Sequence, residues 1–292
     1  MTEWDDLRYI LALSRGKTVR AAAEALGVTH STVSRRLAAI QQRQGSHVFD
    51  RTAAGYAPTA LGSRLISAAE HMEEAFLTAE RRSRAAEQQL SGPITVSLPH
   101  AIAQLLLLDE LVEFSHQYPD IEVTIDSSYM FANLDKSEAD IVVRGVDQPP
   151  EHYVGRRLFH YGLCEYCAVD YLDNTPAAER RWITWLEDGK PPAWIAHSPF
   201  PDVPLGLNIT DIDLRTAAAV ACHGMIRTAC YIGDLDPRLM RVPGAKPVMA
   251  SELWVLTHPD LQETPRIKAL MRFITAVLLK KRRLIEGLKE VT

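Results

Sequence analysis

Short polar side chains and an arginine gather within one short stretch near the N-terminus. His30, Ser31, Ser34 and Arg35 share one face of an expected helix. Side chains of this size can approach base edges in the major groove, and an arginine can bind guanine or a phosphate. This spacing therefore favours nucleic-acid recognition. The alternative is a helical hairpin whose polar face only contacts solvent.

The flanking residues predict the helices that would position this face. Gly27 stands where a first helix would end in a left-handed residue, and Thr29 is a suitable N-cap for a second helix. Apolar residues recur at helical spacing on the inner side of both helices: Val19, Ala22, Ala23, Leu26, Val33, Leu37 and Ile40. Together these features predict a helix-turn-helix within residues 18–40.

Four cysteines raise a second kind of chemistry. Cys164 and Cys167 have Cys-x-x-Cys spacing, and Cys222 and Cys230 flank a turn that could bring them near the first pair. At the start of a helix this spacing can form a reactive dithiol or half of a zinc site. Here the pair falls in an expected strand, where residues three apart point to opposite faces. Buried, inert thiols are favoured, and redox sensing through the four cysteines is the alternative.

The pattern changes at Ser91-Gly92-Pro93, which opposes continuation of a helix. Strands are then expected at 94–98, 121–125, 141–143, 163–169, 193–197, 225–231 and 252–257. Helices are expected at 101–117, 130–137, 210–222 and 265–285, the last with Thr264 as N-cap before Pro265. This alternation predicts parallel β-α-β units with helices on both faces of a sheet.

Polar residues follow several of the expected strands. In open α/β sheets ligands collect at the carboxyl ends of strands, so these residues are candidates for binding an anion or another polar molecule. The candidates are Pro99, His100, Ser127, Ser128, Arg144, His197 and His223. For each histidine the alternative is a purely structural role.

Composition sets the outer limits. The chain has 292 residues with a net charge of −5, but residues 1–62 carry eight Lys or Arg against five Asp or Glu. A mildly basic head on an acidic body suggests polyanion contact at one end only. No apolar run could span a membrane and no signal peptide is recognisable, so we expect a cytoplasmic protein. Motifs typical of nucleotide-binding proteins, hydrolases and metalloproteases are absent. We therefore expect that the protein is not an enzyme and that it binds no cofactor or metal.

Residues 21–37 resemble the winged helix-turn-helix of LysR-type transcriptional regulators. The resemblance continues through Val48-Phe49-Asp50-Arg51, which is similar to the family's entry into the wing, and through Pro58-Thr59-Ala60-Leu61-Gly62, which is similar to the start of its linker helix. The sequence departs from the family pattern at Gly16, Val19, His30 and residues 41–45. The resemblance implies DNA contacts by Thr29, His30, Ser31, Thr32, Ser34 and Arg35, and by Arg51 from the wing.

The resemblance also implies an order of domains. An all-α winged helix-turn-helix head would span residues 1–58 and a long dimerisation helix residues 59–90. A two-lobed α/β effector domain resembling periplasmic binding proteins would follow at 91–292, with lobe I at about 91–160 and 255–292 and lobe II at about 161–254. Such a protein would be a homodimer or homotetramer that reads dyad-symmetric double-stranded DNA and senses a small molecule. The remaining alternative is a small-molecule-binding protein without specific DNA binding.

Overall fold

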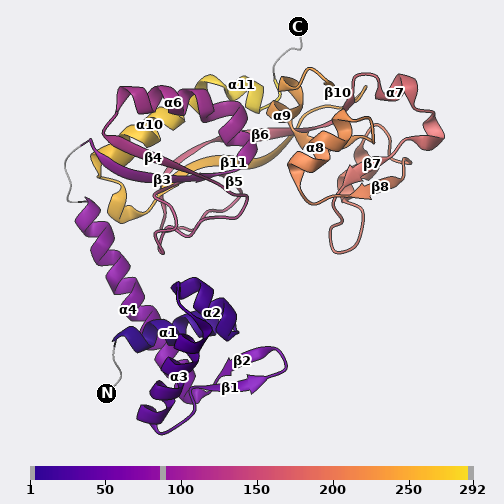
Figure 1. Cartoon of the computed structure of the whole chain (residues 1–292). Coiled ribbons are helices and arrows are strands. Elements are labelled where there is room, and N and C mark those ends of the chain that lie inside the picture. The colour runs from indigo at the N-terminus through magenta and orange to yellow at the C-terminus, as the bar shows by residue number, and fades with distance from the viewer. Residues whose placement is uncertain (1–3, 86–89, 289–292) are drawn as a thin grey trace. The chain divides into compact units, whose positions relative to one another are not determined.

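The computed structural model describes residues 4–85 and 90–288. The chain divides into two compact units, Met1–Arg81 and Arg82–Thr292, and each is described by itself (Figure 1). Within the described residues, no helix combines the length and the apolar character that a membrane span requires.

The first unit packs three helices beside a hairpin and the start of a fourth helix. Its elements are α1 (Trp4–Gly16), α2 (Val19–Leu26), α3 (His30–Gln44), β1 (Phe49–Thr52), β2 (Gly55–Pro58) and α4 (Ala60–Ala85). The expected inner face of the second helix is confirmed, because Val33, Leu37 and Ile40 are all buried. They pack with Ile10 and Leu13 of α1 into one core. The hairpin β1–β2 forms the wing; its strands are too short for an alternating pattern to reveal them.

The second unit is a two-lobed α/β domain. Its first half contains β3 (Gly92–Leu98), α5 (His100–Ile102), a π-helical turn η1 (Ala103–Leu107), α6 (Leu108–Gln117), β4 (Ile121–Ser127), β5 (Ile141–Val146) and β6 (Val154–Ala168). The next elements are α7 (Tyr171–Asn174), η2 (Ala177–Glu179), β7 (Trp182–Thr184), η3 (Ala193–His197), β8 (Leu205–Asn208), α8 (Ile212–Val220), β9 (Ile226–Ala229) and α9 (Cys230–Leu235). The unit ends with β10 (Leu239–Arg241), β11 (Val248–Thr257), η4 (Pro259–Leu261), α10 (Pro265–Lys280) and α11 (Arg282–Ile285).

The prediction of a parallel sheet is only half right. β3 pairs in parallel with β4 and β5, as expected. The rest of the main sheet, in the order β10-β6-β11-β5 with β9 beside β6, is antiparallel. The reason is that β11 returns from the second lobe and enters the sheet between β5 and β6, so the chain runs against its neighbours there.

Two segments differ from their expected secondary structure. Residues 193–197 form the 3-10 helix η3 instead of a strand, and residues 130–137 form turns instead of a helix. Pro191 and Pro192 come directly before η3, where their fixed φ favours a helical turn. The loop at 130–137 is held by contacts with other segments, which local periodicity does not reveal.

The long strand β6 connects the two lobes. Its first part pairs with β11, and its last residues pair with β9 and β10. Helices α6 and α10 cover one face of the main sheet over a large apolar core (Figure 1). On the opposite face, Val142 packs against Leu134 and its neighbours in the 131–139 loop. This architecture leaves the junction of the lobes as the place where distant segments converge.

Candidate nucleic-acid interface and effector cavity

The turn between α2 and α3 is capped at both sides. Thr18 caps α2 by accepting a hydrogen bond from the Ala21 amide at 3.1 Å, and Thr29 caps α3 by accepting one from Thr32 at 3.3 Å. Gly27 ends α2 at φ +64°, the left-handed conformation that glycine adopts without strain. These caps fix the angle at which α3 leaves the turn.

The outer face of α3 carries most of the predicted DNA contacts. His30, Ser31, Ser34 and Arg35 are exposed, and so is Thr29 at the helix start. Thr32 is half-buried, and its hydroxyl lies 2.9 Å from the Thr29 hydroxyl. The structure therefore brings five of the six predicted helix residues to one accessible surface and gives Thr32 a capping contact.

The inner end of α3 is held by an acidic residue of α1. Asp6 is completely buried and forms ion pairs with Arg36, at 3.6 Å, and with Arg43. The Arg36 guanidinium also lies 5.7 Å from the centre of the Tyr9 ring. Two of the arginines on α3 thus hold the head together, which leaves Arg35 as its outward-facing arginine.

Arg51 projects from the first strand of the wing. It is exposed, its Nε donates a hydrogen bond to the Tyr56 hydroxyl at 3.1 Å, and its guanidinium lies 5.6 Å from the centre of the Tyr56 ring. The wing itself is tied to the α1–α2 turn, because the Tyr56 amide donates to the Lys17 carbonyl at 2.8 Å. Arg51 is therefore presented by a braced hairpin, with its charge available at the surface.

A cavity of about 420 Å³ opens between the two lobes of the second unit. This volume lies within the range of about 300–1,000 Å³ that small-molecule sites occupy. Arginines from three elements reach it: Arg144 from β5, Arg215 from α8 and Arg227 from β9. Five buried polar atoms at this cavity have no hydrogen-bond partner among the described residues: the Nε atoms of the three arginines, the Trp194 indole nitrogen and the Thr228 hydroxyl.

The structure separates the predicted effector residues. Pro99 and Arg144 line the cavity. His100 lies 3.3 Å from the Ser127 hydroxyl, so these two do meet, but His100 lines a different surface hollow beside α8 and α9. The Ser128 hydroxyl accepts from the Met130 amide at 3.0 Å. His197 and His223 are exposed, and neither lines the cavity.

Several cavity residues were missed by the sequence reasoning. Arg215 lies among apolar residues of α8, and Arg227 interrupts the buried strand β9. A charged side chain in an otherwise apolar element is a usable signal, because burying an unpaired charge is costly. Trp185, Trp194 and Tyr129 carried no such signal, since aromatic residues are common in any core.

Three of the four cysteines are buried, and all four are free thiols. As expected for a strand, Cys164 and Cys167 pack into different clusters. Burial raises the pKa of Cys164 to about 12, and it raises the pKa of Cys167 and of Cys230 to about 11. Because the thiolate is the reactive form, these three side chains are poorly suited to redox chemistry.

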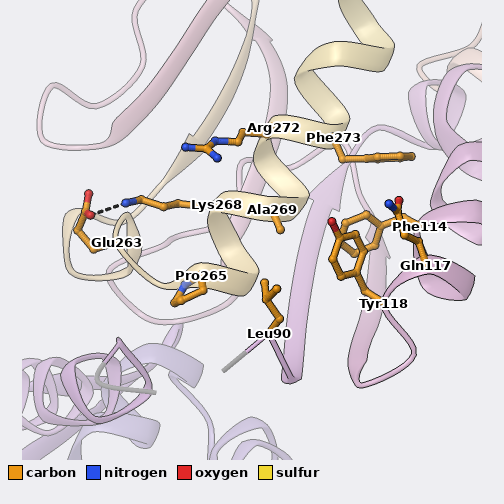
Figure 2. A pocket seen from close by; sticks show the side chains of 10 residues that line it. All are labelled: Leu90, Phe114, Gln117, Tyr118, Glu263, Pro265, Lys268, Ala269, Arg272 and Phe273. Atoms are coloured by element: carbon orange, nitrogen blue, oxygen red, sulfur yellow. Dashed lines mark hydrogen bonds and ion pairs between the residues drawn. The ribbon is translucent and has the colours of Figure 1, made fainter. Parts of the chain in front are cut away.

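A second hollow lies between α6 and α10 (Figure 2). Phe114, Tyr118 and Phe273 form its aromatic wall, and Lys268 is paired with Glu263 at its rim. Among the described residues, no buried polar atom without a partner lines this hollow. Its polar lining residues Gln117, Glu263, Lys268 and Arg272 are exposed or half-buried, so none of them is a buried group that would orient a ligand.

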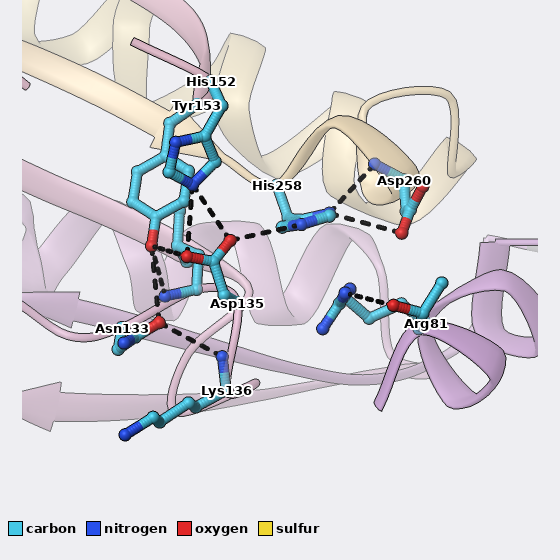
Figure 3. A network of polar contacts seen from close by, with 10 residues as sticks. Arg81, Asn133, Asp135, Lys136, His152, Tyr153, His258 and Asp260 are labelled. Carbon is cyan, nitrogen blue, oxygen red and sulfur yellow. Dashed lines mark hydrogen bonds and ion pairs between the residues drawn. The ribbon is translucent and has the colours of Figure 1, made fainter. Parts of the chain in front are cut away.

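A polar network around Asp135 joins three loops of the second unit (Figure 3). The Asp135 carboxylate lies 3.0 Å from His152 and 3.4 Å from His258, and it accepts a hydrogen bond from Tyr153 at 3.2 Å. No group of three metal-ligating side chains was found among the described residues, this network included. Its contacts join loops at residues 131–137, 150–153 and 258–260, so we assign it a structural role.

Comparison with known proteins places both units. The model described as "Bacterial regulatory helix-turn-helix protein, lysR family" matches residues 4–63, and "LysR substrate binding domain" matches residues 87–279. An HTH-type transcriptional regulator of Xanthomonas campestris pv. campestris is 27% identical over 173 residues, which cover 58% of this chain and 49% of that protein. The chain thus spans about half the length of this curated relative.

Two solved structures share the fold. CrgA of Neisseria meningitidis, a LysR-type transcriptional regulator, has a TM-score of 0.56 at 18% identity, covering 95% of this chain and 99% of that one. AphB of Vibrio cholerae, a virulence activator, has a TM-score of 0.59 at 15% identity, covering 94% and 99%. The domain matches cover most of the sequence, and the family consists of regulators rather than enzymes. The chain belongs to the LysR family of DNA-binding transcriptional regulators and carries that family's effector-binding domain.

Proposed function

We propose that this regulator reads a dyad-symmetric promoter site as a homo-oligomer and responds to a small molecule bound between the lobes of its effector domain. In this proposal residues 1–58 bind DNA, residues 59–90 pair subunits and residues 91–292 sense the effector. The observation that carries the proposal is the exposed polar face of α3 together with Arg51 on its braced wing.

The DNA contacts divide by chemistry. His30, Ser31 and Ser34 have short side chains that suit base edges, whereas Arg35 and Arg51 supply charge for guanine or phosphate. The departure from the family at His30 bears on which bases are read, since imidazole and the family's usual amide present different donors and acceptors. Arg36 and Arg43 take no part, because Asp6 holds both.

The pairing of subunits rests on apolar residues that α4 exposes. Met72 is 43% exposed and Phe76 is 55% exposed, and Phe76 borders an apolar groove between α1, α2 and α4. A second copy of α4 would cover these side chains and space two reading heads along DNA. Residues 86–89 of the expected dimerisation helix lie outside the described residues.

The test is capture of genomic DNA fragments by purified protein across a salt series, followed by sequencing of the retained fragments. We expect enrichment of a two-fold-symmetric sequence. The variants Arg35→Ala and Arg51→Ala should each weaken binding and reduce the slope of log affinity against log salt by about one where a phosphate contact is lost. Arg238→Ala is the matched control, because Arg238 is exposed on the effector domain and, among the described residues, its side chain pairs only with nearby Asp236. Retention without sequence preference would overturn the proposal.

A further inference from the structure

The cavity between the lobes carries more positive charge than its own carboxylates neutralise. We infer that it binds an organic carboxylate with a flat aromatic body, an inference that rests on the proposed role of this cavity as the effector site. The argument follows from the partners of the three arginines and from the walls between them.

Arg144 is a buried cation held by neutral groups. It is 4% exposed, and its Nη atoms donate to the Val143 and Met130 carbonyls at 2.9 and 2.6 Å and to the Ser97 hydroxyl at 3.1 Å. Asp126 is reached only through that hydroxyl, which donates to it at 2.9 Å. Burial lowers the pKa of Arg144 to about 10, although Asp126 opposes the shift. At neutral pH the group remains charged, and its buried Nε is still available to an acceptor.

Arg215 repeats this arrangement from the second lobe. It is 5% exposed, and one Nη donates to the Ile209 and Thr210 carbonyls at 3.0 and 3.1 Å. Its guanidinium lies 4.4 Å from the centre of the Trp185 ring, which holds the group flat against an aromatic wall. Burial lowers the pKa of Arg215 as well, although the nearby Asp211 opposes the shift. Among the described residues, no carboxylate forms an ion pair with either Arg144 or Arg215.

Arg227 differs because its charge is already balanced. Its Nε lies 3.6 Å from the buried Glu165 carboxylate, and its guanidinium lies 5.3 Å from the centre of the Trp194 ring. Burial raises the pKa of Glu165, and the nearby Arg227 opposes that shift. Glu165 lies behind Arg227 and outside the lining, whereas the carboxylate within the lining, Glu187, is exposed in a turn. The uncompensated charge of the cavity thus comes from Arg144 and Arg215, which suits an anionic group of the ligand.

The walls between these charges are apolar and aromatic. Aliphatic side chains from both lobes line the cavity, namely Ile102, Leu106, Leu163, Ile212, Ile232 and Leu253. Trp185, Trp194 and three tyrosines complete the lining. Flat aromatic rings pack well against such walls, whereas an inorganic anion would leave them without contacts. The Trp194 indole N–H and the Thr228 hydroxyl, both without a partner among the described residues, suit a hydroxyl or carbonyl substituent on the ring.

In the experiment the full chain is titrated with pairs of probes, and each pair is a carboxylate and its uncharged amide. Calorimetry and tryptophan fluorescence measure the binding. The carboxylates are benzoate, 4-hydroxybenzoate, phenylacetate and indole-3-acetate; each is compared with its amide, and benzylamine and inorganic phosphate complete the set. We expect a Kd below about 1 mM for at least one carboxylate, with its amide at least about tenfold weaker. The inference is overturned if no carboxylate binds, if the amides bind equally well, or if only benzylamine or phosphate binds.

Variants locate the binding. Arg144→Met and Arg215→Met should each weaken the carboxylate by about tenfold or more, because each removes a charge-assisted hydrogen bond. Arg215→Lys should retain part of the affinity, and the exposed Arg156→Met should leave it unchanged. Equal binding to all four variants would place the ligand elsewhere and overturn the inference. The wild-type probe pairs decide the question even where a variant fails to fold.

DNA binding measured on the same preparations separates this inference from the proposed function. If sequence-specific DNA binding is retained but no aryl carboxylate binds, the ligand class is wrong and the regulator proposal stands. If an aryl carboxylate binds while DNA is retained without sequence preference, the chemistry of the cavity is supported and the regulator proposal fails.

Discussion

Replacing Asp6 by asparagine tests how the reading helix is held. Asp6 is fully buried, whereas its partners Arg36 and Arg43 are 37% and 35% exposed. Breaking a buried ion pair by removing one partner costs about 3–5 kcal/mol. The arginines here can recover water, and asparagine keeps the shape and one acceptor oxygen. We therefore expect about 2 kcal/mol of lost stability in the head.

The neighbouring residue supplies the control. Asp5 is 42% exposed and lies 3.1 Å from Arg36 and 3.7 Å from Arg8. Exposed pairs of this kind contribute about 0–1 kcal/mol, so Asp5→Asn should change stability by less than about 1 kcal/mol. The two variants remove the same charge from adjacent positions, and they differ in burial.

The assay is calorimetry of the full chain together with hydrogen exchange of peptides from α3. For a unit of this size, a loss of 2 kcal/mol corresponds to a fall in Tm of about 8–16 °C. The amides of α3 should exchange faster in Asp6→Asn, while those of α10 should not change. If Asp6→Asn and Asp5→Asn shift the head transition equally, the buried pair does not stabilise the reading helix and the reasoning is refuted.

Three further predictions follow from single groups. Iodoacetamide at pH 8 should label Cys222 alone in the folded protein, because the other three thiols are buried and burial raises the pKa of each to about 11 or 12. Detection of a second modified cysteine by mass spectrometry would contradict this prediction. Binding of an aryl carboxylate should be constant between about pH 6 and 9, where the carboxylate is ionised, and should weaken as pH rises through 10, where Arg144 loses its charge, as calorimetry in alkaline buffers can show. Gly55→Ala should destabilise the head by about 2–3 kcal/mol, since φ is +113° and its Cβ would lie 2.3 Å from the Lys17 carbonyl; Gly27→Ala, with φ +64° and open space, should cost about 1–2 kcal/mol in the same thermal melts.

The head could be predicted from the sequence because its determinants are local. Gly27 and Thr29 act on the backbone within a few residues, and the inner face of α3 repeats at helical spacing. The departure at residues 41–45 became interpretable only in the structure. Arg43 of that segment pairs with Asp6, and Gln41 accepts the Val48 amide at 3.2 Å, so these residues bind α3 to α1 and to the wing.

The sheet could be predicted only in part, for a reason that β11 illustrates. The expected strand at 252–257 exists, but sequence pattern alone does not give the direction in which a late strand enters an existing sheet. β11 is inserted antiparallel between β5 and β6. Of the residues chosen by the rule that ligands collect at the carboxyl ends of strands, Pro99 after β3 and Arg144 in β5 line the cavity, whereas Ser127 and Ser128 at the end of β4 and His197 at the end of η3 do not.

The candidate effector residues show the same limit in chemical terms. His100 and Ser127 lie close together, because β3 and β4 are parallel neighbours, but His100 lines a hollow outside the cavity between the lobes. Arg144 and Arg215 lie far apart in the sequence, and only the folding of β6 between the lobes brings their elements to one cavity. What the sequence does contain is the anomaly of a charge within each apolar segment. Since a buried guanidinium without a carboxylate lowers stability, the presence of two such groups at one cavity is more simply explained by a bound anion than by folding.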